Sequence, residues 1–384
     1  TELTRALGEM PFEAPSVIHR SVIAMNLYVD DLVLAKLPFT QALIQLLDED
    51  GVPQVATTSE YGIALLQRLA KPVYDLLRLL TLNKNRQRQR IDDLLPEWDT
   101  IQQEAQLVDQ NVCETAGLAL DAFQYCSRWS FAQMLRLMQE HVSLGFELQL
   151  YHQDELDAVY WYWNYLVSAR LHVVSLQLDH RAQLEKEKLV VALEQEREKD
   201  KRRGGKKKGG KGSKKKYSAA EEAALAPRQK SEEEMLLILQ RLASRGVFQY
   251  AVALRKLGLL EEPTLEFTTR EARFNHRFSS FRGIVQPSFL EFSSFLRSSS
   301  SETDQAPAVL EAAEACFRQT KDMVDVFLPL LGSERERAEL TSLKKVSVFN
   351  IVSIARLKRA GYKAQSTSVD FSDHKHTPKV STAV

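Results

Sequence analysis

Apolar residues recur at steps of three and four along most of this chain, which is the spacing of one face of an α-helix. The longest such segment has an aromatic first half and a charged second half, as expected for a helix that leaves the protein body. Strand–helix alternation and internal repeats are missing from the sequence, so the predicted fold class is all-α. The spacing predicts helices at 61–82 (kinked or divided at Pro72), 90–108, 123–142, 156–200, 231–260, 308–331 and 333–360.

Local signals mark the ends of some predicted helices. Ser231 and Glu234 have the spacing of a capping box, in which each side chain bonds the other residue's backbone N–H, so a helix is expected to begin there. Gly258 is expected to end this helix and Gly246 to bend it. The adjacent carboxylates Asp92 and Asp93 are expected at a helix start, where they offset the helix macrodipole.

The run KRRGGKKKGGKGSKKK at 201–216 cannot belong to a folded core. It carries ten positive charges, no negative charge and no apolar residue, and its glycines raise the entropic cost of ordering the backbone. The whole chain balances 51 basic against 51 acidic residues, so the remainder carries a net charge of −10. A basic segment on an acidic body indicates a polyanionic partner, RNA in the first place, rather than a basic catalytic cleft.

Three interpretations of this run stay open: a solvated linker, a linker that contacts phosphates by charge alone, and a nuclear-import signal. No aromatic side chains are interleaved to stack on bases, so sequence-specific RNA recognition is not indicated. A smaller basic patch at 83–90 lies between two predicted helices and could join the contact. The RNA- or ribosome-binding candidates are Lys201, Arg202, Arg203, Lys206, Lys207, Lys208, Lys211, Lys214, Lys215, Lys216, Arg86, Arg88 and Arg90.

The run divides the predicted organisation of the chain. Residues 1–200 are expected to form a helical domain that ends in the long charged helix, and 201–230 a basic linker rich in lysine and glycine. Residues 231–360 are expected to form a second helical part that packs on the first. The last segment, 361–384, lacks periodicity and is expected to be an extended tail.

Residues 267–295 differ from the helical segments. They are aromatic and rich in arginine, and Gly283 and Pro287 interrupt them, so an ordered but mostly irregular connection is expected. Such length is unusual in a connection that binds nothing. One alternative is a partner-binding surface made of exposed aromatic and arginine side chains, and the other is a loop packed on the chain's own helices.

The sequence does not support a catalytic site. It contains no GxSxG, HExxH or catalytic-cysteine context, and no acetyl-coenzyme A loop of the R/Q-x-x-G-x-G/A kind. His276 is expected to be a buried histidine that bonds a backbone carbonyl. His374 and His376 form an HxH pair in what is expected to be an exposed polar tail, and no cysteine or carboxylate cluster with metal-ligand spacing supports them. No cofactor or metal site is therefore predicted.

Cysteine usage and hydropathy indicate a cytosolic protein, unless the basic run directs it to the nucleus. The three cysteines have no paired spacing, which argues against a disulfide framework, and Cys126 is expected in the core. No window reaches the about 20 apolar residues of a membrane span. The opening residues TELTRALGEM contain neither an initiator Met nor a signal-peptide stretch, which suggests that the sequence begins within a longer protein.

Four stretches together match a known family in order and spacing. The words GFELxLY, RxxHRF and FSxHK within them are uncommon. The combination resembles the C-terminal half of the large auxiliary subunit of NatC amino-terminal acetyltransferases, over nearly the whole chain from about residue 16. The stretches are Asn83–Val108 (NKNRQRQRIDDLLPEWDTIQQEAQLV), Gly145–Tyr165 (GFELQLYHQDELDAVYWYWNY), Phe267–Phe292 (FTTREARFNHRFSSFRGIVQPSFLEF) and Asp370–Lys379 (DFSDHKHTPK).

The resemblance implies a non-catalytic helical scaffold. In that family the subunit holds a GNAT-type catalytic subunit, which binds acetyl-coenzyme A, and a small Sm-like subunit. The complex acts at the ribosome on nascent chains that begin with Met followed by a bulky hydrophobic residue. The residues expected to pack on the catalytic subunit are Arg273, Phe274, His276, Arg277, Phe278, Phe371, His374 and Lys375. The rival interpretation is a helical RNA-binding or nuclear adaptor unrelated to acetylation.

Overall fold

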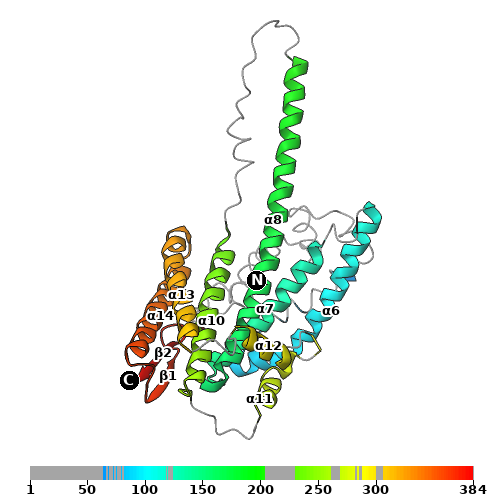
Figure 1. Ribbon diagram of the computed structural model, residues 1–384. Coiled ribbons are helices and arrows are strands. Elements are labelled where there is room, and N and C mark those ends of the chain that lie inside the picture. Colours follow the sequence, from blue (N-terminus) through cyan, green and yellow to red (C-terminus); the bar gives the residue numbers. More distant parts are fainter. Residues whose placement is uncertain are drawn as a thin grey trace, which may run out of the picture.

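The computed structural model describes most of the chain from residue 82 onward (Figure 1). Between residues 180 and 203 it describes the backbone but few side chains. The described residues are 82–117, 124–203, 230–260, 269–281, 283–284, 288–299 and 306–383, with single positions at 64, 65, 68, 72, 75, 79 and 119.

Long helices form most of the described structure, as the apolar spacing predicts. The predicted all-α class is confirmed, with one small hairpin at the C-terminal end. The helices are α6 (Lys84–Ala116), α7 (Tyr125–Glu147), α8 (Leu156–Arg203), α10 (Glu232–Lys256), α11 (Arg270–Arg277), α12 (Phe289–Ser299), α13 (Ala306–Phe327) and α14 (Glu334–Arg359). Short 3-10 turns lie at η1 (Gln153–Glu155), η2 (Ser279–Phe281) and η3 (Leu328–Leu330).

The long helices form a row in which each packs on the next, in the order α6, α7, α8, α10, α13 and α14 (Figure 1). The core runs through the row and is rich in large aromatic side chains that are almost completely buried, such as Trp98, Trp163 and Phe317. The second half of α8 extends beyond the row, as its charged sequence predicts. Helices before and after the basic run, α8 and α10, lie side by side in the row.

Several predicted helix ends are confirmed. Ser231 Oγ accepts from the Glu234 N–H at 3.1 Å, and Glu234 Oε2 accepts from the Ser231 N–H at 2.9 Å, so the capping box is formed. Gly258 follows the end of α10 with φ +67°, a conformation that glycine adopts without a steric penalty. Gly246 lies inside the continuous helix α10 against the Phe317 ring. Instead of bending the helix as expected, Gly246 allows helices α10 and α13 to approach closely.

Two predicted boundaries are wrong. Helix α6 begins at Lys84, because the Asn83 side chain caps it by accepting from the Arg86 N–H at 3.0 Å. The basic stretch 84–90 is therefore helix and not a connection, and Asp92 and Asp93 lie in the third turn rather than at the start. Residues 267–295 were expected to be irregular, but they contain α11, η2 and the first part of α12.

The C-terminal segment, expected to be an extended tail, contains two paired strands that dock on α14. Strands β1 (Ser366–Asp370) and β2 (Lys379–Ala383) pair antiparallel, with Val369 opposite Val380. Helix α14 secures the hairpin through the buried Asn350, whose Nδ2 donates to the Pro378 carbonyl at 2.9 Å and whose Oδ1 accepts from the Val380 N–H at 2.8 Å. Period-2 burial is weak in strands this short, which explains why the sequence pattern missed them.

Among the residues that the structure describes, no helix combines the length and apolar character needed to cross a membrane.

Two helical glycines permit close packing to different degrees, and this difference can be tested. A Cβ at Gly145 would lie 2.1 Å from the Tyr151 hydroxyl, whereas one at Gly246 would lie 3.0 Å from the nearest Phe317 atom. Alanine gains about 1 kcal/mol over glycine in a helix interior, but overpacking costs about 1–3 kcal/mol. We expect Gly145→Ala to lower the thermal midpoint clearly and Gly246→Ala to lower it less. An equal or reversed effect would contradict the packing described.

Candidate functional site

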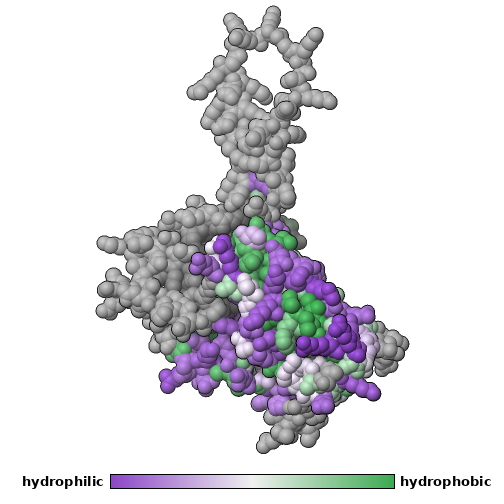
Figure 2. All heavy atoms as spheres, turned by 90° about the vertical axis from the view of Figure 1, so that its left-hand side faces the viewer, coloured by the Kyte–Doolittle hydropathy of each residue, from purple (hydrophilic) through white to green (hydrophobic). Residues whose placement is uncertain are grey.

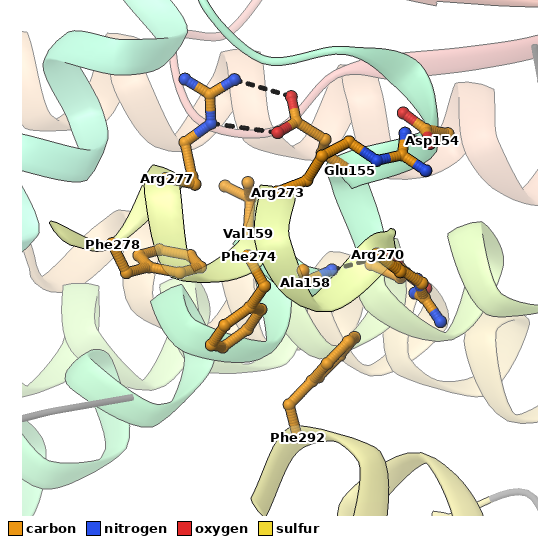
Figure 3. A pocket seen from close by; sticks show the side chains of 11 residues that line it. Asp154, Glu155, Ala158, Val159, Arg270, Arg273, Phe274, Arg277, Phe278 and Phe292 are labelled. Carbon is orange, nitrogen blue, oxygen red and sulfur yellow. Dashed lines mark hydrogen bonds and ion pairs between the residues drawn. The ribbon is translucent and has the colours of Figure 1, made fainter. Parts of the chain in front are cut away.

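Helix α11 presents three arginines to the carboxylates around the start of α8 (Figure 3). Arg270, Arg273 and Arg277 are spaced at i, i+3 and i+7, so they share one face of the helix. Three carboxylates lie opposite within four residues of chain, in η1 and the first turn of α8. We call these six residues, together with Arg255 of α10, the charge cluster; its acidic members are Asp154, Glu155 and Asp157.

Asp157 is the most buried member of the charge cluster, because its side chain has no exposed surface. Arg255 donates to it through Nε at 3.0 Å and Nη2 at 3.1 Å, and Arg270 also pairs with it. Its own helix contributes the Ala158 N–H at 2.8 Å. A buried carboxylate is tolerated only when paired charges and hydrogen bonds replace its water. Asp157 therefore ties α8 to both α10 and α11.

The other two carboxylates are paired in a similar way. Arg277 holds Glu155 with two hydrogen bonds, from Nε at 3.1 Å and Nη2 at 2.8 Å, the geometry in which guanidinium and carboxylate match best. The Arg277 guanidinium also lies 5.1 Å from the centre of the Tyr151 ring. Asp154 pairs with Arg273. Burial raises the pKa of Asp154, and the positive charge of Arg273 opposes that rise.

Aromatic rings form the apolar side of the same contact. Phe274 stacks on Phe292 with ring centres 5.3 Å apart, and Phe278 lies 4.8 Å from Tyr162. Phe274 and Phe278 are each only 3% exposed. The space enclosed between these rings and the charge cluster is about 20 Å³. That volume fits about one water molecule, so the contact is a packed junction and not a substrate pocket.

The C-terminal segment docks where the end of α7 meets the start of α8, a region that we call the corner. The Tyr160 hydroxyl donates to the His376 carbonyl at 2.7 Å, His376 bonds Ser143, and Phe371 lies 5.4 Å from Phe146. His374 accepts through Nδ1 from the His376 N–H at 3.2 Å and the Thr377 N–H at 3.1 Å. Burial lowers the pKa of His374, which fits a neutral ring whose Nδ1 is an acceptor.

The first of the four matched stretches reaches the same corner from α6. Arg88 donates to the His141 carbonyl at 3.2 Å and lies 2.9 Å from its Nε2, while Asp92 contacts Nδ1 at 2.7 Å. The His141 ring packs on Phe281 at 5.1 Å. Glu147, at the end of α7, pairs with Lys84 and lies 3.6 Å from Lys375. All four stretches therefore converge on one corner of the chain.

The residues expected to face a partner are thus mostly turned inward. The premise that the aromatic side chains of 267–292 are exposed is wrong, because Phe274 and Phe278 are buried. The expected exposed tail is also wrong, because His374 and His376 are buried. His276, expected to be buried, is exposed on α11. Arg273, Arg277 and Lys375 meet carboxylates of this chain, and Phe371 is half-buried.

The candidates for RNA contact are only partly described. Lys201, Arg202 and Arg203 are the last residues of α8, and residues 206–216 lie outside the described residues. Within the small patch on α6, Arg88 is engaged with His141, and Arg90 pairs with Asp75 at 3.0 Å. Arg86 alone of the three is exposed. The three side chains are therefore not equivalent as phosphate contacts.

Sequence reasoning missed the charge cluster, although a signal for it was present. The i, i+3, i+7 spacing of the arginines indicates a helix face, and the acids Asp154, Glu155 and Asp157 lie within one turn. The glycine and proline that follow the arginines obscured that period.

Cys126 is in the core as expected. Within the described part of the chain, no three His, Cys, Asp or Glu residues group as metal ligands.

Comparisons with a family model and with known proteins point to the same family. A family model described as "NAA35-like, TPR repeats" matches residues 2–380. The N-alpha-acetyltransferase 35, NatC auxiliary subunit of Homo sapiens is 25% identical over 397 residues, covering 97% of this chain and 50% of that protein. The Gallus gallus protein of the same name gives the same identity and coverage. The chain spans about half the length of these curated relatives.

Solved structures show the same fold. One chain in a crystal structure of the NatC complex bound to Gag peptide and CoA aligns with a TM-score of 0.62 and 18% identity, covering 97% of this chain and 57% of that one. A chain of the apo NatC complex gives the same values. The similarity therefore shows a shared fold over nearly the whole of this chain.

The charge cluster predicts unequal costs for removing carboxylates. We expect Asp157→Asn to reduce the free energy of unfolding by about 3 kcal/mol, because it removes the buried carboxylate on which the Arg255 and Arg270 guanidinium groups converge. The matched control is Asp93→Asn on α6, whose side chain is 68% exposed and 3.6 Å from Arg90; it should cost at most about 1 kcal/mol. Chemical denaturation followed by circular dichroism measures both. Equal costs would show that the cluster does not stabilise the fold.

The buried histidines predict loss of stability in acid. Burial lowers the folded-state pKa of His374 and His141 below the ordinary value of 6.5, so the unfolded chain binds protons first as pH falls. Stability is therefore full above about pH 6.5 and declines below it, by up to about 1.4 kcal/mol per pH unit for each histidine. His374→Asn, which keeps an acceptor oxygen near the position of Nδ1, should flatten the decline between pH 7.5 and 5.5. An unchanged pH profile of the thermal midpoint in this variant would contradict the assignment.

Proposed function

The chain belongs to the NAA35-like family, and on that premise we propose that it is an auxiliary, non-catalytic scaffold subunit of a NatC-type amino-terminal acetyltransferase. It would hold a GNAT-type catalytic subunit and a small Sm-like subunit. The assembled complex would acetylate nascent chains that begin with Met and a bulky hydrophobic residue. The observation that carries the proposal is the family match over residues 2–380.

The inward packing of the matched stretches supports a scaffold role. The charge cluster and the docked hairpin fix α6, α7, α8, α11 and the C-terminal segment to one corner of the row. A rigid helical row costs little conformational entropy when a partner binds, because its surface is already ordered. In this proposal the corner shapes the platform, and the catalytic chemistry belongs to the partner.

An exposed apolar surface on α13, η3 and α14 is the best candidate for the partner-facing side. Val348, Phe349 and Val352 share one face of α14 and are 37–44% exposed. Val326 and Leu330, at the end of α13 and in η3, are 62% and 59% exposed. Figure 2 shows apolar patches among hydrophilic residues on the side that α13 and α14 form. Exposed apolar clusters of this kind are typical of subunit interfaces.

We expect the double variant Val348→Asp with Val352→Asp to lose the catalytic subunit. Two charges placed in an apolar contact must be desolvated without a partner, which reduces affinity by at least tenfold. The matched control is Leu107→Asp, which changes a 50% exposed leucine on α6. The measurement is co-purification of the GNAT-type subunit, with acetylation of Met-Leu peptides as a second readout. Retention of the subunit by the double variant would remove this surface from the proposal.

Ribosome contact is the second part of the proposal. The basic run at 201–216 would bind ribosomal RNA by charge alone, with Arg86 as an additional contact. It follows the projecting half of α8 (Figure 1), whose end is remote from the packed row. A contact of this kind releases counter-ions, so its affinity falls steeply as salt rises.

Charge-neutral and charge-retaining variants test this contact. Replacing the seven lysines between 206 and 216 with glutamine should abolish most ribosome co-sedimentation at about 50 mM salt, and replacing them with arginine should not. The wild-type signal should itself drop strongly by about 200 mM salt. If glutamine and arginine variants sediment alike, the run does not act through charge.

Co-purification also separates this proposal from the adaptor interpretation. Recovery of an acetyltransferase with the chain as bait supports the scaffold. Recovery of RNA and ribosomes without one would favour an RNA-binding or nuclear adaptor.

A further inference from the structure

A polar groove lies between α6 and the start of α7, away from the charge cluster. It has a volume of about 330 Å³. Glutamines dominate its lining: Gln102, Gln106 and Gln110 from α6, and Gln124 at the start of α7. Phe131 adds an apolar surface and Arg128 a cation. The helices α6 and α7 that form its walls are adjacent in the row (Figure 1).

The three glutamines of α6 are free to bind another molecule. They follow one another at i, i+4 and i+8, so they form a line along one helix face. Gln106 and Gln110 are exposed and Gln102 is half-buried. None of the hydrogen bonds found among the described residues uses their amides. By contrast, Gln103, on a neighbouring face, donates to Asp99 at 3.2 Å.

The groove is not explained by the needs of the fold. Asp109, the carboxylate among the described lining residues, is already occupied at the start of α7, where it accepts from the Cys126 and Ser127 N–H groups at 3.0 and 2.8 Å. Arg128 donates to the Gln124 side chain at 3.1 Å, which fixes both at the far wall. Asp109 and Arg128 contribute one negative and one positive charge to the described lining, and its other residues are uncharged, so together they carry no net charge. A charged ligand such as a phosphate is therefore not the favoured occupant.

The spacing of the glutamines fits an extended polypeptide main chain. Four residues of α-helix advance about 6.0 Å, and two residues of extended chain advance about 6.6 Å. Each glutamine amide has both a donor and an acceptor, so it can pair with a peptide N–H and C=O on one edge. Over three glutamines the mismatch is about 1.2 Å, which three rotatable side-chain bonds absorb.

We propose that this groove binds an extended polypeptide segment through its main chain, with Phe131 contacting one apolar side chain. Recognition is then largely independent of the sequence of the bound segment, because the glutamines form hydrogen bonds with its main-chain N–H and C=O groups. The inference stands apart from the NatC assignment, since it uses only the α6–α7 groove.

The probe is a fluorescein-labelled nine-residue peptide, Thr-Ser-Thr-Ser-Leu-Ser-Thr-Ser-Thr, titrated with the full chain and followed by anisotropy. β-branched residues favour the extended state. We expect weak binding that falls about fivefold in Gln106→Ala and at least about tenfold in the triple variant Gln102→Ala, Gln106→Ala, Gln110→Ala. Gln103→Ala is the matched control and should bind like the wild type. All four positions are on the helix surface, and thermal midpoints verify that each variant folds.

Two N-methylated peptides make the test specific for main-chain recognition. In an extended peptide, the N–H groups of alternate residues point to the same edge. N-methylation at the odd positions removes the N–H donors along one edge of the extended peptide, and N-methylation at the even positions removes those along the other edge. We expect one of these peptides to lose binding and the other to retain it. Absence of binding, binding that survives the triple variant, or equal loss with both methylated peptides would overturn the proposal.

Discussion

The carboxylate of Asp157 has no exposed surface, and the rest of the corner depends on its neutralisation. A charge removed from water costs several kcal/mol unless other charges and hydrogen bonds replace the solvent. Arg255 comes from α10 and Arg270 from α11, so Asp157 holds both helices against the start of α8. The charge cluster therefore fixes how α10 and α11 meet α8, which apolar packing alone would leave open because hydrophobic burial is not directional.

The same corner receives segments from both ends of the described chain. Glu147 meets Lys84 of α6 and Lys375 of the C-terminal segment, while Tyr160 and Ser143 hold His376. The side chains inside the corner are consequently engaged in contacts within the chain. The surfaces that we propose for partners lie elsewhere, on the outer face of α13 and α14, on the basic run that follows α8 and in the glutamine-lined groove. A division between a fixed interior and several outward faces is what the proposed scaffold role requires.

The sequence predicted the helices well where one period dominates, as in α8, α13 and α14, and it predicted the capping box at Ser231 because that signal is local. The sequence-based predictions failed where the contacts of a residue are made with residues far away in the sequence. Arg270, Arg273 and Arg277 look like interface residues until the carboxylates more than a hundred positions earlier are placed beside them. His374 and His376 look like a polar tail until Asn350 and Tyr160 bind the backbone around them. The family resemblance identified the right stretches, but it could not say that they contact one another.

Amide hydrogen exchange followed by mass spectrometry tests this account most directly, with the chain alone and then with the catalytic subunit. We predict that α11 (270–277) and residues 374–377 exchange as slowly in the isolated chain as α7 and the first half of α8, and that binding of the partner changes their exchange little. Protection on binding should appear instead on the outer face of α14. Rapid exchange of α11 and 374–377 in the isolated chain, followed by protection when the catalytic subunit binds, would contradict the account and show that these segments face the partner.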